Sequence, residues 1–162
     1  MDNPRIPRYR IALVKETGVQ VEYPRTVTEQ VKAAAIFKEV SSEADREYLM
    51  VATLDAKNKV IGVNLVSIGT ISSAIAANRD IFKLALLQNA AAIIVGHNHP
   101  SGSSQPSKQD LDMWEQLKEA GKIMNVSVLD SIILGDTKFY SLSDYMEREY
   151  ARSDTSVSMV AG

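Results

Sequence analysis

Residues 91–110 constrain the fold more strongly than any other part of the sequence. An apolar run over 91–95 leads into His97 and His99, the only two histidines of the chain, and a loop rich in Pro, Gly and Ser follows. A short apolar run bounded by turn residues predicts a buried strand, and the polar segment that opens at Ser107 predicts a helix. Because side chains two apart on a strand point to the same side, both imidazoles can converge on one point.

Ser107 and Asp110 lie three residues apart and therefore share one face of the predicted helix. Their hydroxyl and carboxylate can turn back toward the histidines. Two imidazole nitrogens and one carboxylate oxygen make three protein ligands, which leave a fourth position for water, as in catalytic zinc sites. A structural alternative exists for each fragment, since a strand-end histidine is usually hydrogen-bonded within the protein and Ser-x-x-Asp fits a capping box. We favour a metal site of His97, His99 and Asp110 because the combined pattern is the more restrictive one.

The composition limits which other functions are open to the chain. With no cysteine, disulfides, thiolate catalysis and zinc sites that use Cys are excluded, and so is a zinc deaminase with its Cys-x-x-Cys pair. The 18 basic and 20 acidic residues are mixed along the chain without a Lys/Arg run, so the charge pattern does not support nucleic-acid binding. We find no apolar stretch of membrane-spanning length and no apolar signal core at the N-terminus, and we expect a cytoplasmic protein.

The length of 162 residues predicts one folded domain. We divide the chain into an N-terminal arm (1–25), a folded core (26–150) and a flexible tail (151–162). Loose alternation on both sides of Thr17-Gly18 predicts that the arm is a hairpin. An isolated hairpin is only marginally stable, so the arm must lean on the body or on a partner chain, and a homodimer is one expectation.

Periodicity predicts the remaining elements. In chain order we expect hairpin strands over 9–15 and 19–23, a helix capped by Thr26 or Thr28, a polar loop over 41–46, strands over 48–54 and 60–68, a helix over 75–89, a strand over 91–95, a helix from 107 to about 120 ended by Gly121, a strand over 126–134, an extended segment over 139–141 and a short helix over 143–150. Hairpins mixed with helix-linked strands indicate an α/β fold, a three-layer mixed β-sheet flanked by helices. The histidines then fall at the C-terminal end of a central strand, the usual place for a site in an open α/β sheet.

On these motifs the chain resembles the JAMM/MPN (JAB domain) metalloprotease superfamily, and specifically its bacterial RadC-like branch. The superfamily pattern is a Glu well upstream, then His-x-His, seven residues and Ser-x-x-Asp, and it is matched by Glu47, His97, His99, Ser107 and Asp110. The RadC-like features are the sequence His-Asn-His-Pro-Ser-Gly over 97–102, Gln105-Pro106-Ser107 and Leu129-Asp130. The resemblance covers roughly residues 30–145.

The resemblance implies a zinc metallopeptidase or isopeptidase of cytidine-deaminase-like fold, acting on a peptide or protein substrate. It implies that His97, His99 and Asp110 hold Zn²⁺, that Ser107 helps to stabilise the tetrahedral intermediate, and that Glu47 is the general acid/base. Position in the motif selects Glu47 over other acids in the polar loop. The alternative for Glu47 is an ordinary exposed acid at a strand edge.

Three positions depart from the RadC-like pattern. Ala77-Asn78 stands where these sequences often carry His-Pro, and Ser131 stands where a His often follows Leu-Asp. None belongs to the metal motif, so the departures bear on substrate orientation or on contacts behind a ligand. The helix-hairpin-helix module that precedes this domain in full-length RadC proteins is not seen, which weakens a DNA role. A non-catalytic interaction module and a DNA-repair-associated RadC-like protein remain the alternative functions.

Two polar residues next to these motifs have structural explanations. Asp130 interrupts the apolar run over 126–134, and a buried carboxylate needs a partner. We predict that it accepts hydrogen bonds from the backbone or from a hydroxyl, rather than orienting a ligand histidine. Asn98, between the histidines, is expected to stabilise the turn. The stripe of Leu111, Trp114 and Leu117 is expected to pack in the core.

Overall fold

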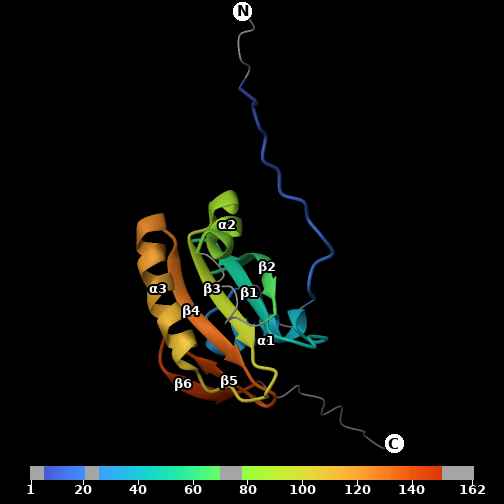
Figure 1. The fold of residues 1–162 in the computed structure, drawn as a ribbon, viewed down its shortest axis with the longest axis vertical. Coiled ribbons are helices and arrows are strands. Elements are labelled where there is room, and N and C mark those ends of the chain that lie inside the picture. The colour runs from blue at the N-terminus through green and yellow to red at the C-terminus, as the bar shows by residue number, and fades with distance from the viewer. Residues whose placement is uncertain (1–5, 21–25, 70–77, 151–162) are drawn as a thin grey trace, which may run out of the picture.

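The computed structural model describes residues 6–20, 26–69 and 78–150, and within them a single mixed sheet is covered by helices on both faces (Figure 1). The strand order is β2-β1-β3-β4-β5-β6. In chain order the elements are α1 (Gln30–Val40), β1 (Tyr48–Leu54), β2 (Val60–Ile68), α2 (Asn78–Gln88), β3 (Ala92–Asn98), α3 (Lys108–Met124), β4 (Ser127–Leu134), β5 (Lys138–Ser141) and β6 (Met146–Glu149). The predicted three-layer α/β architecture is confirmed.

The middle of the sheet positions the histidine motif. β1 pairs antiparallel with both β2 and β3, whereas β3 and β4 are parallel and are joined by the crossover helix α3. β1 and β3 are buried along almost their whole length, because helices cover both faces of the sheet at these strands. Central strands of this kind hold the residues at their ends in a rigid frame.

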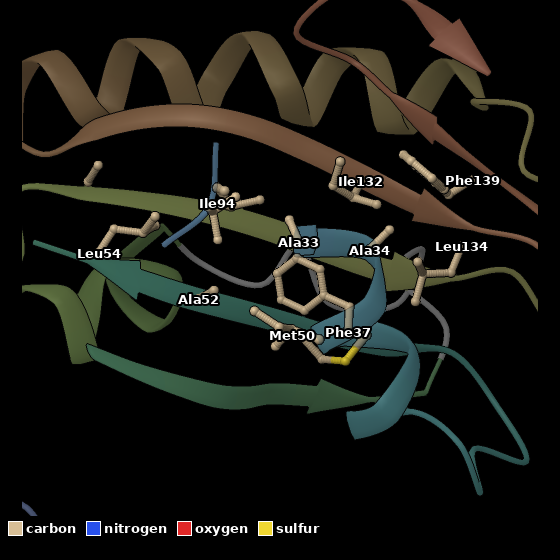
Figure 2. Close-up of a cluster of buried hydrophobic side chains, with 13 residues drawn as sticks. Ala33, Ala34, Phe37, Met50, Ala52, Leu54, Ile94, Ile132, Leu134 and Phe139 are labelled. Carbon is tan, nitrogen blue, oxygen red and sulfur yellow. The ribbon is translucent and has the colours of Figure 1, made fainter. Parts of the chain in front are cut away.

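Alternation along β3 divides its side chains between two cores. Ile94 joins the cluster under α1, where Figure 2 shows Phe37 directed at the sheet between β1 and β3. A Cβ on Gly96 would lie 2.4 Å from the Phe37 ring, so glycine is needed for α1 to approach this closely. Val95 belongs to the opposite cluster, with side chains of α2 and α3. His97, two residues after Val95, therefore faces the α3 side of the sheet.

The hairpin predicted for the N-terminal arm is not present over the residues of the arm that the structure describes. Residues 6–20 form neither helix nor strand and are exposed, so the strand expected over 9–15 is absent; 21–23, part of the second strand, lie outside the described residues. No residue of this segment is buried, and a two-stranded hairpin without support from the body is only marginally stable. A homodimer through the arm stays a prediction. The tail over 151–162 and Ala77 also lie outside the described residues.

Two helix boundaries differ from the prediction. α1 begins after Glu29, which makes no side-chain cap, and the hydroxyl of Thr28 instead accepts a hydrogen bond from Lys32 Nζ. Gly121 does not end α3; the helix continues to Met124, and Asn125 stops it in the left-handed conformation with φ 55°. A Cβ on Gly121 would lie 2.6 Å from the carbonyl oxygen of Val126, so this glycine serves close approach rather than termination.

The predicted helix over 143–150 is wrong, because Met146–Glu149 forms strand β6. This strand pairs antiparallel with β5, and Tyr145 at φ 56° lies in the turn that precedes it. The ladder with β5 satisfies backbone groups that a short isolated helix would leave open at its ends. In α3, Trp114 and Leu117 are buried as expected, whereas Leu111 is 37% exposed.

The helices of the described part of the chain include none that combines the length and the apolar character required to cross a membrane.

Candidate metal centre

The two imidazoles meet at the end of β3. The strand continues to Asn98, beyond the predicted end at residue 95, so His97 is a strand residue and its side chain is fully buried. The backbone N–H of His99 donates to the carbonyl of Leu134 (2.9 Å), which keeps the chain aligned with β4 one residue past the strand. The Nε2 atoms of His97 and His99 lie 3.1 Å apart. The convergence expected from strand alternation is therefore observed.

Asp110 faces both histidines from the first turn of α3. Its Oδ1 lies 3.0 Å from His97 Nε2, and its Oδ2 lies 3.4 Å from His99 Nε2. Ser107, the N-cap residue, holds this carboxylate in place: its backbone N–H (2.6 Å) and its hydroxyl (2.7 Å) both donate to Oδ2, and its Oγ accepts from the Asp110 N–H (3.2 Å). The capping box and the convergence on the histidines are thus made by the same side chains and are not alternatives.

The hydrogen bond behind His99 determines which of its nitrogens faces the site. Its Nδ1 lies 2.9 Å from the carbonyl oxygen of Ser103, and a carbonyl can only accept. Nδ1 therefore carries the hydrogen, and in the neutral ring the lone pair of Nε2 points toward Asp110. His97 differs, because its buried Nδ1 has no hydrogen-bond partner among the residues that the structure describes.

The electrostatics of the cluster favour positive charge. Burial alone would raise the pKa of Asp110, but the hydrogen bonds from His97 and His99 outweigh it and hold the pKa well below the ordinary carboxyl range. The hydrogen bond to Asp110 raises the pKa of His99 against the effect of burial, and the charge of Glu47 adds to the rise. The cluster thus stabilises a cation, which can be a proton or a metal ion.

The distances test whether a metal ion fits this donor set. Tetrahedral zinc with Zn–N and Zn–O bonds of about 2.0–2.1 Å places its ligand atoms about 3.4 Å apart. The two Nε2 atoms lie 3.1 Å apart, and Asp110 approaches them with different oxygens, Oδ1 at 3.0 Å from His97 and Oδ2 at 3.4 Å from His99. With both imidazoles neutral and protonated at Nδ1, the two Nε2 atoms and an oxygen of Asp110 are close enough to hold one divalent cation. The residues present therefore fit a metal ion.

Glu47 is placed beside the histidines by Asn98. The Asn98 side chain donates to the carbonyl of Arg46 (3.0 Å) and accepts from the backbone N–H of Tyr48 (2.7 Å), so it fastens both neighbours of Glu47 to the end of β3. Asn98 was expected to stabilise the turn after the histidines; its side-chain contacts instead join the start of β1 to the end of β3. Glu47, His97 and His99 each offer a ligand atom within 4.8 Å of the others, a cluster that could hold a metal ion.

Asp130 lies in a separate buried network. Its Oδ1 accepts from the backbone N–H groups of Ser131 (2.7 Å) and Ser143 (2.9 Å), and its Oδ2 accepts from the Ser141 hydroxyl (2.6 Å). The predicted structural role is confirmed. Ser131, one of the departures from the family pattern, is buried, and its hydroxyl has no hydrogen-bond partner within the described ranges.

The sequence pattern missed Ser103, whose carbonyl orients His99, and Glu147, which holds the loop around it. A carbonyl contact depends on backbone geometry rather than on residue type, so no sequence signal marks Ser103. Glu147 was hidden by the prediction of a helix over 143–150.

Comparisons with known proteins agree with the fold. The RadC-like JAB domain family matches residues 27–149. A UPF0758 protein of Desulforudis audaxviator (strain MP104C) is 44% identical over 121 residues, which are 75% of this chain and 53% of that protein. A second, from Desulforamulus reducens, is 39% identical over 131 residues, covering 81% of this chain and 55% of the relative. The chain thus spans about half the length of these curated relatives. Because the family match extends over most of the sequence, this chain belongs to the RadC-like JAB domain family.

Proposed function

We propose that the chain is a zinc-dependent hydrolase of amide bonds, a metallopeptidase or isopeptidase that acts on a peptide or protein substrate. The observation that carries the proposal is the convergence of His97, His99 and Asp110 within 3.0–3.4 Å at the end of β3. Zinc is the metal that best suits two imidazoles and one carboxylate with an open fourth position.

In this proposal Glu47 is the general acid/base. A bound zinc ion would supply a more acidic water and a charge that polarises the scissile carbonyl. Glu47, which lies in the same cluster as the histidines, accepts the proton of the attacking water and delivers it to the leaving amine. A carboxylate suits both steps because it can hold the proton between them.

Ser107 would donate a hydrogen bond to the developing oxyanion. Its hydroxyl donates to Asp110 Oδ2 in this structure, so the hydrogen must rotate away from Asp110 for that role. The oxygen meanwhile remains held by the Asp110 backbone N–H. Ser107 would therefore have two roles. It positions the Asp110 carboxylate, and it stabilises the negative charge that develops on the substrate.

The test compares metal content and activity in the same preparations. Protein purified without an affinity tag should contain one equivalent of zinc and hydrolyse fluorogenic peptide or isopeptide-linked lysine substrates. Glu47→Gln should keep the zinc and lose about 10²–10⁴-fold in rate, because only the proton-transfer group is removed. The matched control is Glu43→Gln, which changes an exposed acid in the preceding loop and should behave as wild type.

Three results would overturn parts of the proposal. Full activity of Glu47→Gln would remove Glu47 from the mechanism. Wild-type protein that takes up no zinc would favour a non-catalytic interaction module. A DNA affinity that falls steeply with salt, without hydrolysis, would favour a DNA-repair-associated role.

A further inference from the structure

The loop between β3 and α3 is held by a carboxylate that lies outside the metal motif. Glu147, on β6, accepts hydrogen bonds at Oε1 from the Ser104 hydroxyl (2.7 Å) and from Gln105 Nε2 (2.9 Å). Its Oε2 pairs with Lys138 Nζ at 3.1 Å. These hydrogen bonds from Ser104, Lys138 and Gln105 lower the pKa of Glu147, so the carboxylate is ionised at neutral pH. Ser104 is almost fully buried, whereas the Glu147 side chain is 31% exposed, so only the serine end of this contact lies inside the protein.

The residue just before this contact is the one that orients His99. The Ser103 carbonyl accepts from His99 Nδ1, and Ser104 and Gln105 follow directly. On the other side of Ser103, the Gly102 carbonyl accepts from the backbone N–H of Asp136 (2.9 Å) in the turn between β4 and β5. The direction of the Ser103 carbonyl is therefore set from both sides, by a backbone contact at Gly102 and by Glu147 at residues 104 and 105.

We propose that Glu147 is a positioning residue for His99. By holding Ser104 and Gln105 it keeps the Ser103 carbonyl against Nδ1, and this hydrogen bond keeps a hydrogen on Nδ1, which leaves Nε2 as the nitrogen available to a metal ion. Strand β6 thereby controls the affinity of a metal site to which it contributes no ligand. The inference rests on the proposed metal site for its functional consequence. Its structural content, the hydrogen bond from His99 Nδ1 to the Ser103 carbonyl, exists without metal.

Zinc affinity measured by competition with a chromophoric chelator tests the consequence. Partners behind metal ligands typically contribute 10–100-fold to metal affinity, and Glu147 acts through the loop, so Glu147→Ala should weaken zinc binding about 10-fold. Glu149→Ala is the matched control, since it removes an exposed acid two residues along the same strand and should leave the affinity unchanged. Lys138→Ala removes the third partner of Glu147 but not its contacts with the loop, and should also bind as wild type.

The ring signals of His99 in ¹⁵N NMR spectra of the metal-free protein test the tautomer directly. At a pH above the raised pKa of His99, where the ring is neutral, we expect a population protonated at Nδ1 in the wild type and in Glu149→Ala, and a mixture of tautomers in Glu147→Ala. Ser104→Ala should reproduce part of the change, and its effect should not add to that of Glu147→Ala because both act through one contact. A merely structural role of β6 would lower the thermal midpoint without moving these signals.

Unchanged His99 signals in both Glu147→Ala and Ser104→Ala would overturn the inference. If Glu147→Ala does not fold, Ser104→Ala and Glu147→Gln give the same readouts with smaller disturbance. Wild-type protein without zinc affinity would refute the proposed function, while the NMR comparison would still decide the placement of His99.

Discussion

Two aspartates are buried almost equally in this protein and behave in opposite ways. Asp110 is 2% exposed and Asp130 is 4% exposed. Two imidazoles face Asp110, and their hydrogen bonds lower its pKa although burial opposes them. Burial dominates at Asp130 and raises its pKa, because its hydrogen-bond donors are neutral backbone N–H groups and a hydroxyl. The charge of the hydrogen-bond partners, rather than the extent of burial, explains why the pKa values of the two aspartates shift in opposite directions.

This difference indicates which carboxylate can belong to a functional site. The contacts of Asp130 fasten β4 to the segment of Ser141 and Ser143, and they are complete within the protein. The contacts of Asp110 join two imidazoles that can also bind a metal ion, which is the basis of the proposed metal site. Functional sites commonly contain a group whose pKa is strongly shifted by a titratable partner, and Asp110 has this property. The following predictions test this comparison.

The largest effect should come from exchanging each carboxylate for an amide. Asp110→Asn should reduce zinc affinity by more than about 100-fold, beyond the usual loss for a residue behind a ligand, because the charged ligand itself is removed. Asp130→Asn should leave zinc affinity unchanged. Titration with a competing chelator measures both, and equal losses in the two variants would break the distinction between a ligand and a structural carboxylate.

Removing the Asp130 side chain should reduce stability instead. Asp130→Ala leaves the backbone N–H groups of Ser131 and Ser143 and the Ser141 hydroxyl without their acceptor, which should lower the free energy of unfolding by about 2 kcal/mol. Urea unfolding measures the change. Zinc affinity in the folded variant should equal that of wild type, and a parallel loss of zinc would contradict the separation of the two networks.

The serines that serve the two carboxylates offer a matched pair of smaller changes. Ser107→Ala and Ser141→Ala each remove a hydroxyl that donates to a buried aspartate, at 2.7 and 2.6 Å. Each should cost about 1 kcal/mol of unfolding free energy, through a lost helix cap in one case and a lost hydrogen bond in the other. Only Ser107→Ala should also weaken zinc binding. If Ser141→Ala weakened it equally, the hydroxyl of Ser107 would have no specific role at the site.

The smallest effect is a pH dependence. Since burial raises the pKa of Asp130 above its ordinary value of 3.8, the folded protein binds a proton there more tightly than the unfolded chain does. The associated stabilisation is complete below the ordinary pKa and is lost as the pH rises through the raised folded value. Asparagine cannot titrate, so Asp130→Asn should gain stability relative to wild type over that interval. Urea unfolding at a series of pH values measures the gain, and a constant difference would contradict the raised pKa.

Much of the site was accessible from local pattern. The spacing of His97 and His99 on a strand, and of Ser107 and Asp110 in the first turn of a helix, predicted which side chains share a face, and the structure shows these contacts. Glu47 required the resemblance to the family, because a single acid at the start of a strand carries no spacing of its own. The strand over 9–15 was wrong because a hairpin without support from the body is only marginally stable, and the helix over 143–150 was wrong because pairing with β5 overrides local periodicity.

The sequence by itself determined the donor chemistry, two imidazoles and a carboxylate without any thiol, and the strand, loop and helix that carry them. Those properties depend on residue type and on separations of a few residues, which the geometry of each element converts into position. Only the tertiary structure decided that Asn98 holds Glu47 beside the histidines, that Glu147 supports the loop of Ser103, and that the two buried aspartates differ in pKa. Each of these depends on groups that the pairing and packing of distant segments bring together, and local sequence carries no record of such neighbours.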